Sequence, residues 1–372
     1  MLTERQSLLR RLTDDGTVRM GWAAEVMEAP APFGGRRVVP DRLRGMLLGL
    51  AIGDALGRTT EGMPPDERRA RFGEIRDYLP NRYVGNRPIG LPSDDTELAF
   101  LTVAHLLEHG RIEPDALAEQ FCAQRIFGIG HSTRLFVDSW RRTHDWRVAS
   151  QPSAGNGALM RIAPVLLPYL ATGGPDLWVD TALATTVSHN DRAAIATSIA
   201  FVGLLSELLV MDRPPAREWW VETFMARARP IEGDDTQYRP RGGPLMHSPP
   251  GPLWSFVAAH VPPALEKPAD EAQQAWYSGA YLLETVPTVL HILARHAGDP
   301  EEAIIRAVND TKDNDTVAAV VGAAVGALHG ERALPARWRD GHSGRVIADR
   351  GEPNLFRLID SAVARFAAST MQ

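Results

Sequence analysis

Three glycines spaced four residues apart constrain the fold of this chain more than any other feature. Gly45, Gly49 and Gly53 lie in "DRLRGMLLGLAIGDALG" (41–57), whose other apolar residues recur at helical spacing. Residues four apart stack on the same side of a helix, so one side of this helix is nearly bare. Each glycine weakens a helix by about 1 kcal/mol relative to alanine, so three together favour close packing against another backbone or a ligand.

The rest of the chain repeats helical patterns, and no segment shows the sustained period-two alternation typical of strands. We therefore predict an all-α fold. Beyond residues 41–57, helices are expected at 95–109, 113–125, 133–142, 157–171, 176–188, 191–211, 216–228, 270–296, 300–309, 315–330 and 354–368.

Two stretches depart from this pattern. Residues 1–40 include the Pro- and Gly-rich "MEAPAPFGGRRVVP" (27–40) and are predicted to form an N-terminal extension with one short helix at 3–12. Residues 229–269 are also rich in Pro and Gly and predict a long loop, which in a compact domain is often a functional lid or a mobile segment. Residues 41–372 would then form a single domain that carries this insertion.

Composition argues against several classes of protein. The formal net charge of −6 disfavours a general nucleic-acid binder, which would more often be basic. The one cysteine, Cys122, rules out an intramolecular disulfide and fits a reducing compartment. The charged N-terminus has no signal-peptide core, and no apolar run reaches the ~18 residues of a membrane span. We expect a cytoplasmic protein without membrane association.

Two acidic clusters each precede an apolar helix: "SDDT" (93–96) and "DNDT" (313–316). One interpretation is helix capping, because Asp, Ser and Thr are preferred N-caps, and Asp94 with Glu97 has the spacing of a capping box. The other is a metal site, because one cap needs one side chain, and adjacent buried carboxylates must protonate or find a cation. Oxygen-only donors suit Mg²⁺, Mn²⁺ or Ca²⁺ rather than zinc, and two such clusters could converge on a pair of ions. The spacing alone leaves both interpretations open.

Five motifs, taken in order, resemble those of the ADP-ribosylglycohydrolase family, which includes ADP-ribosylarginine hydrolases and dinitrogenase reductase-activating glycohydrolases. They are "GLAIGDALGRTTEG" (49–62), "SDDT" (93–96), "GNGALMRIAPV" (155–165), "SHNDRAAIATSIAF" (188–201) and "DNDTVAAVVGAAVGALHG" (313–330). The resemblance implies a compact orthogonal bundle of helices around a binuclear Mg²⁺ centre, with Mn²⁺ as the alternative ion. It also implies hydrolysis of the N- or O-glycosidic bond that links ADP-ribose to a modified protein side chain, arginine being the first expectation.

The resemblance further implies roles for individual residues. The metal ligands would be Ser93, Asp94, Asp95, Asp313, Asp315 and Thr316. The substrate-binding residues would be Gly155, Asn156, Gly157, His189 and Tyr281, with Tyr281 on the adenosine side. The metals would orient the ribose, and Asp94, Asp95 or Glu61 would take or give the proton as water attacks the anomeric carbon.

Some features leave alternatives open. Where the family usually has two glycines before the second cluster, this chain has Thr311 and Lys312, and the lysine could meet a phosphate, pair with an aspartate or face solvent. Some family members carry an N-terminal extension and block an ADP-ribosyltransferase, so residues 1–40 could bind such a partner, with or without turnover of ADP-ribose. Serine-linked, nucleic-acid-linked and small-molecule conjugates are alternatives to arginine. A monomer is the family default.

Overall fold

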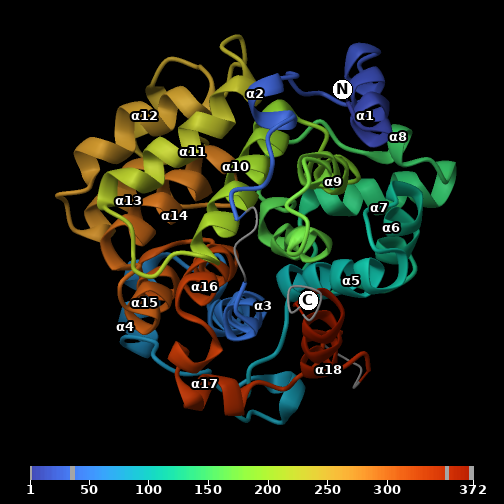
Figure 1. The fold of residues 1–372 in the computed structure, drawn as a ribbon. Helices are drawn as coiled ribbons and strands as arrows, with labels where there is room; N and C mark the ends of the chain where they lie inside the picture. The colour runs from blue at the N-terminus through green and yellow to red at the C-terminus, as the bar shows by residue number, and fades with distance from the viewer. Residues whose placement is uncertain (1, 34–37, 348–351, 368–372) are drawn as a thin grey trace.

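The computed structural model describes residues 2–33, 38–347 and 352–367, and these ranges fold mainly into helices (Figure 1). Within them, extended residues pair only as isolated bridges, so the all-α prediction is confirmed. The first α-helices are α1 (Glu4–Asp14), α2 (Ala24–Met27), α3 (Pro40–Gly57), α4 (Pro65–Phe72), α5 (Asp94–His109), α6 (Pro114–Cys122), α7 (His131–Thr143), α8 (Trp146–Ala149) and α9 (Asp176–Thr186). The later ones are α10 (Arg192–Leu208), α11 (Arg217–Glu232), α12 (Leu253–Ala264), α13 (Ala269–Trp276), α14 (Leu282–His296), α15 (Pro300–Asp310), α16 (Asn314–His329), α17 (Ala336–Gly341) and α18 (Leu355–Ala362). Across the described ranges, no helix combines the length and the apolar character that crossing a bilayer requires.

Helices α3 and α16 pack directly against each other near the centre of the fold (Figure 1). A Cβ atom added at Gly49 would come under 3.0 Å from the backbone of Gly322, and one at Gly53 would come as close to Ala318. Real Cβ atoms do not approach other atoms so closely. The bare side of the glycine helix therefore meets another backbone, as its spacing predicted.

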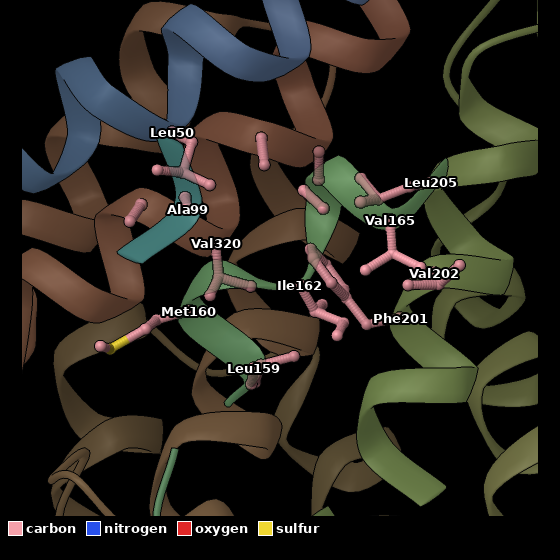
Figure 2. Close-up of a cluster of buried hydrophobic side chains, with 14 of the residues drawn as sticks. Leu50, Ala99, Leu159, Met160, Ile162, Val165, Phe201, Val202, Leu205 and Val320 are labelled. Carbon is pink, nitrogen blue, oxygen red and sulfur yellow. The ribbon is translucent and has the colours of Figure 1, made fainter. Parts of the chain in front are cut away.

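Residues 157–171 lie in the core but do not form the expected α-helix. They form two 3-10 helices, η3 (Leu159–Arg161) and η4 (Ala163–Tyr169), because Pro164 and Pro168 lack the N–H that a continuous α-helix would need. The apolar side chains of this segment still pack against α10 (Figure 2), as shown by Leu159, Ile162, Val165, Phe201, Val202 and Leu205. The hydrophobic pattern thus predicted burial correctly and the type of helix incorrectly.

The stretch 229–269 is more ordered than the predicted long loop. Helix α11 continues to Glu232, and α12 forms inside the stretch. The buried carboxylate of Glu232 accepts hydrogen bonds from the backbone N–H groups of Leu253 (2.6 Å) and Trp254 (3.0 Å) at the start of α12. Because this cap comes from a residue 21 positions away, local turn chemistry could not reveal the helix.

The predicted helix 270–296 is also wrong as a single element, because it divides into α13 and α14. Between them, Tyr277 and Ser278 have φ angles of 76° and 45°. Two successive residues in the left-handed region cannot continue a right-handed helix. The break brings Tyr281 to the start of α14, beside the site described below.

The described part of the N-terminal segment packs onto the helical body. The short helix expected at 3–12 is α1, and its N-cap Thr3 donates to Asp176 of α9 at 2.5 Å. Further along, Asn190 donates to the Thr17 carbonyl and accepts from the Arg19 N–H, both at 2.8 Å. Residues 4–33 are therefore held against the body of the protein rather than projecting as a free arm.

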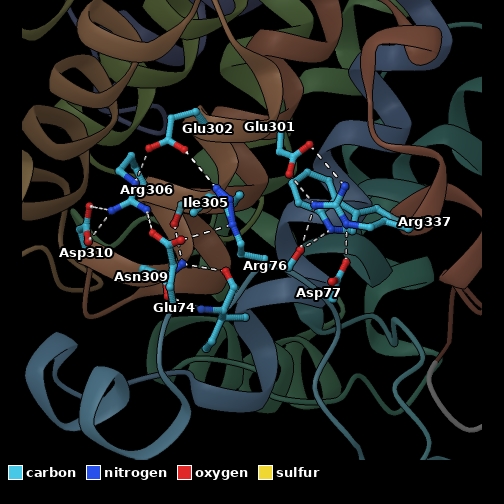
Figure 3. A network of polar contacts seen from close by, with 12 residues as sticks. Glu74, Arg76, Asp77, Glu301, Glu302, Ile305, Arg306, Asn309, Asp310 and Arg337 are labelled. Carbon is cyan, nitrogen blue, oxygen red and sulfur yellow. Dashed lines mark hydrogen bonds and ion pairs between the residues drawn. The ribbon is translucent and has the colours of Figure 1, made fainter.

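A polar network fixes the segment after α4 against α15 (Figure 3). The buried side chain of Asn309 accepts from the Ile75 N–H at 2.7 Å and donates to the Ile75 carbonyl at 2.8 Å. Arg337 of α17 pairs with Asp77 at 2.6 Å and with Glu301 at 2.5 Å. Because α15 ends three residues before Asp313, this network fixes the approach to the second acidic cluster.

Candidate active site

The contact between α3 and α16 brings the acidic residues together. Gly57 ends α3, and an added Cβ there would lie under 3.0 Å from the backbone of Asp315 in the first turn of α16. Asp54 lies one turn earlier on α3 and is fully buried. The glycine side of α3 therefore ends where the second acidic cluster begins.

The two clusters, which are far apart in the sequence, converge in space. Carboxylate oxygens of Asp54, Asp95 and Asp315 all lie within 4.8 Å of one another, and the same limit holds for Glu61, Asp313 and Asp315. Asp315 belongs to both groups. Each group is small enough for its carboxylates to bind one cation, and the shared residue would place two such cations next to each other. Asp94 belongs to neither group, although it lines the same cavity.

Asp54 is a site residue that the sequence analysis did not identify. Its carboxylate accepts hydrogen bonds from the Ser93 N–H (2.9 Å), the Ser93 hydroxyl (2.6 Å) and the Thr96 N–H (3.0 Å). It therefore caps α5 from α3. The available signal was a single acid within the glycine-rich "GLAIGDALG" helix, where an unpaired buried carboxylate would be costly.

The capping interpretation of the two clusters is wrong for their own side chains. The N-cap residues are Ser93 for α5 and Asp313 for α16, and neither makes a side-chain capping hydrogen bond. Since Asp54 does the capping of α5, the carboxylates of Asp94 and Asp95 are left for another role.

Asp95 has an incomplete set of hydrogen-bond partners. Its Oδ1 is buried without one, and its Oδ2 lies 3.1 Å from the Ser93 hydroxyl. That hydroxyl has one proton and lies closer to Asp54, at 2.6 Å, so it cannot satisfy both acids. A buried carboxylate in this position must either take up a proton or bind a cation.

Burial and mutual repulsion dominate the electrostatics of the site. Burial, followed by the charges of Asp54 and Asp94, raises the pKa of Asp95 well above its ordinary value. Burial, followed by the charges of Glu61 and Asp95, does the same to the pKa of Asp315. The carboxylates can therefore all be ionised together only if positive charge is added among them.

Glu61 lies at the rim of the site. Desolvation, then the charges of Asp313 and Asp54, raises its pKa to about 7, although its residue surface is largely exposed. The buried guanidinium of Arg68 holds its loop by donating to the carbonyls of Met63 (2.8 Å) and Thr311 (2.7 Å). This arginine joins the loop of Glu61 to the loop that carries Asp313.

The glycine-rich motif connects the acidic cluster to the wall of the cavity. Asn156 donates to Asp313 at 2.6 Å and to the Thr285 hydroxyl of α14 at 3.0 Å. A Cβ at Gly157 would lie 2.9 Å from Cε1 of His189, so glycine is needed there to make room for the imidazole ring. The sequence analysis assigned this glycine to substrate binding, and the structure adds that the histidine ring packs against it.

His189 has a defined protonation state. Burial, then the charge of Arg161, lowers its pKa to about 3, so the ring is neutral. Arg161 donates to the Ser188 hydroxyl at 2.7 Å, and that hydroxyl lies 2.9 Å from Nδ1 of His189. The other ring nitrogen, Nε2, lies beside Gly157.

These residues line one cavity of about 500 Å³. Its lining includes Glu61, Asp94, Asp95, Asp313, Asp315, Thr316, Gly155, Asn156, Gly157, His189 and Tyr281. Ser93 is not part of this lining, and its hydroxyl donates a hydrogen bond to Asp54. Lys312 instead lies over the ring of Tyr277, 4.0 Å from its centroid, and lines a separate hollow. All of the predicted site residues therefore gather at one place.

The fold and the site together define a class of protein. It is an all-helical protein with an acid-lined cavity that could hold divalent cations. The chain belongs to the ADP-ribosylglycohydrolase family, because the sequence profile of that family matches residues 36–368. The resemblance drawn from the five motifs is thereby confirmed.

Relatives that are named for an activity are similar over most of the chain. The ADP-ribosylarginine hydrolase Tri1 of Pseudomonas putida is 27% identical, covering 80% of this chain and 73% of its own. The ADP-ribosyl-dinitrogen reductase glycohydrolase of Rhodospirillum rubrum is 26% identical, covering 81% and 90%. A solved structure described as an ADP-ribosylglycohydrolase-related protein complex superposes with a TM-score of 0.61 at 27% identity, covering 89% of this chain and 98% of that one.

Proposed function

We propose that this protein hydrolyses the glycosidic bond between ADP-ribose and a modified protein side chain, with arginine as the preferred linkage and Mg²⁺ as the metal. The observation that carries the proposal is the convergence of two acidic clusters on a cavity of about 500 Å³. The arginine linkage is supported by the similarity to the ADP-ribosylarginine hydrolase Tri1 of Pseudomonas putida. A cytoplasmic location, expected from the single cysteine, stays a prediction.

The donor set fits a pair of hard divalent cations. Asp95 offers an unsatisfied buried oxygen, and Asp315 belongs to both groups of carboxylates. The ions would be held by Ser93, Asp94, Asp95, Asp313, Asp315 and Thr316, with Asp54 and Glu61 added by the geometry. Carboxylates and hydroxyls without sulfur or imidazole favour Mg²⁺ or Mn²⁺ over zinc.

The chain's own residues then position the substrate and move a proton. When bound, the ions would supply the charge that orients the ribose hydroxyls and activates water. Asn156 keeps Asp313 in place through its 2.6 Å hydrogen bond, and the neutral ring of His189 lines the cavity in which the ligand would bind. Asp94, Asp95 or Glu61 takes a proton from the attacking water or gives one to the leaving group, since all three line the cavity.

The test is a parallel incubation with arginine-linked, serine-linked and nucleotide-linked ADP-ribose, each with Mg²⁺, with Mn²⁺ or with EDTA. We expect free ADP-ribose from the arginine conjugate with either ion and none with EDTA. Release from the serine conjugate alone would overturn the linkage. Release in EDTA would overturn the metal requirement, and no release from any conjugate would overturn the activity.

The alternative, a protein that neutralises an ADP-ribosyltransferase through residues 1–40, stays a prediction. The described part of that segment is bonded to the body through Thr3, Thr17 and Arg19. A partner would therefore have to bind its outward surface. The complete acidic cluster favours turnover, since a protein that only binds need not keep every carboxylate.

Replacing Gly157 by alanine is expected to weaken substrate binding about tenfold, because the new Cβ would displace the ring of His189. The measurement is the dissociation constant for ADP-ribose in Gly157→Ala, in His189→Ala and in the double variant. Once the imidazole is absent, the glycine change should add little. Equal effects of Gly157→Ala in the presence and absence of His189 would contradict this coupling.

A further inference from the structure

The cavity has a strongly uneven charge. Six carboxylates line it: Glu61, Asp94, Asp95, Asp191, Asp313 and Asp315. Among the described residues of its lining, Arg241 is the only arginine or lysine. His189 is neutral because burial keeps its pKa at about 3, so it does not add a positive charge. Arg241 comes from the Pro- and Gly-rich stretch 229–269, for which the sequence analysis found no role.

The backbone of Arg241 is held in place by α14. Its N–H donates to Oε1 of the buried Glu284 at 2.7 Å, and its guanidinium Nε lies 3.7 Å from the same oxygen. The guanidinium carbon lies 4.7 Å from the ring centroid of Tyr281 and packs over that ring. The side chain is nonetheless more than half exposed, at 57%, so its donors are accessible from the cavity.

Tyr281 connects this arginine to the glycine-rich motif. It forms an isolated bridge with Gly155, and the N–H of Asn156 reaches the carbonyl of the preceding Ala280 at 3.4 Å. Arg241 and Gly155 are therefore both in contact with Tyr281, and all three residues line the same cavity.

We propose that Arg241 binds the diphosphate of the ADP-ribosyl group and so fixes the length and charge of the ligand that the cavity accepts. The proposal rests on the proposed function, which gives the substrate a diphosphate. A guanidinium offers paired donors that match phosphate oxygens, and within the described lining of the cavity Arg241 is the only side chain that supplies one. The stretch 229–269 would then be part of the substrate-binding wall.

A competing explanation is that Arg241 only balances the charge of Glu284. That role predicts a loss of thermal stability on substitution and no preference for phosphorylated ligands. The same oxygen of Glu284 already accepts the Arg241 backbone N–H at 2.7 Å, whereas the guanidinium is 57% exposed and lies 3.7 Å away, so the backbone makes the closer contact and the side chain is left for a ligand. Ligand charge therefore distinguishes the two explanations.

The experiment compares Arg241→Ala, Arg241→Lys and the control Arg239→Ala, which removes an exposed arginine two residues away that does not line the cavity. Calorimetry gives the affinities for ADP-ribose and for adenosine, which has no phosphate, and a thermal melt reports stability. We expect Arg241→Ala to weaken ADP-ribose binding by about 10- to 100-fold. Adenosine binding and the melting temperature should change little, Arg241→Lys should be intermediate, and Arg239→Ala should match the wild type.

Two results would overturn the proposal. One is unchanged ADP-ribose affinity in Arg241→Ala, and the other is an equal loss for ADP-ribose and adenosine together with a lowered melting temperature. Failure of the proposed function would look different. In that case the wild-type protein would release no ADP-ribose from any conjugate, whatever Arg241→Ala does to ADP-ribose binding.

Discussion

Replacing Asp315 by alanine is expected to lower turnover by about 1000-fold, or about 4 kcal/mol of transition-state stabilisation. Asp315 is the residue shared by the two groups of carboxylates, so its loss removes a ligand from both. The measurement is the release of ADP-ribose under saturating Mg²⁺. Turnover within about tenfold of the wild type would show that the shared carboxylate is not needed.

The same variant should be more stable than the wild type when no metal is present. Its carboxylate is 2% exposed, and the neighbouring charges of Glu61 and Asp95 raise its pKa, so the wild-type site stores repulsion. Thermal melts in EDTA and in Mg²⁺ test this. Mg²⁺ should raise the melting temperature of the wild type. Asp315→Ala should have a higher melting temperature than the wild type in EDTA, and Mg²⁺ should raise it little further. An equal gain in both proteins would contradict the assignment.

Asp180 provides a matched control, because it is an equally buried aspartate with a complete set of partners. It accepts from the Ile112 N–H at 3.0 Å and the Tyr169 hydroxyl at 2.6 Å, and it pairs with Arg5. Asp180→Ala should therefore lower stability by about 3 kcal/mol, both with and without Mg²⁺. Turnover per folded molecule should stay unchanged.

The residue pattern indicated that the two clusters could converge, for a chemical reason, and the family resemblance supplied the prediction of a binuclear metal centre. Adjacent carboxylates such as Asp94 and Asp95 exceed what capping needs, and the structure confirms that they do not cap. The spacing of Gly45, Gly49 and Gly53 likewise predicted a close backbone contact without naming the partner. Both patterns are local, so they can be read from a single segment.

Residues that act through distant partners could not be found in this way. Asp54 caps a helix that begins 40 positions later, and Arg68 binds the carbonyl of Thr311. The backbone of Arg241, which lies outside the helices, is held beside the cavity by Glu284 of α14. In the sequence each of these side chains looks like an ordinary charged residue, because its hydrogen-bond partner is distant in the chain and is brought close only by the fold.

Gly53→Ala is expected to destabilise the protein by about 3 kcal/mol or more, because the new Cβ would come under 3.0 Å from the backbone of Ala318 and Ala319. The gain in helix propensity from glycine to alanine is only about 1 kcal/mol and cannot offset this clash. The affected atoms belong to the backbone of α16, so no side chain can rotate away. The measurement is the free energy of unfolding in denaturant.

Gly53→Ala should also weaken metal binding at the site, because Asp54 follows Gly53 directly and lies close to Asp315 of α16. Separating the two helices would move Asp54 from Asp315 and reduce the stabilisation that Mg²⁺ gives. Gly298→Ala is the matched control, since a Cβ there would meet nothing within 4 Å. If Gly53→Ala were as stable as Gly298→Ala and responded equally to Mg²⁺, the close contact of α3 and α16 could not be what holds the carboxylates together.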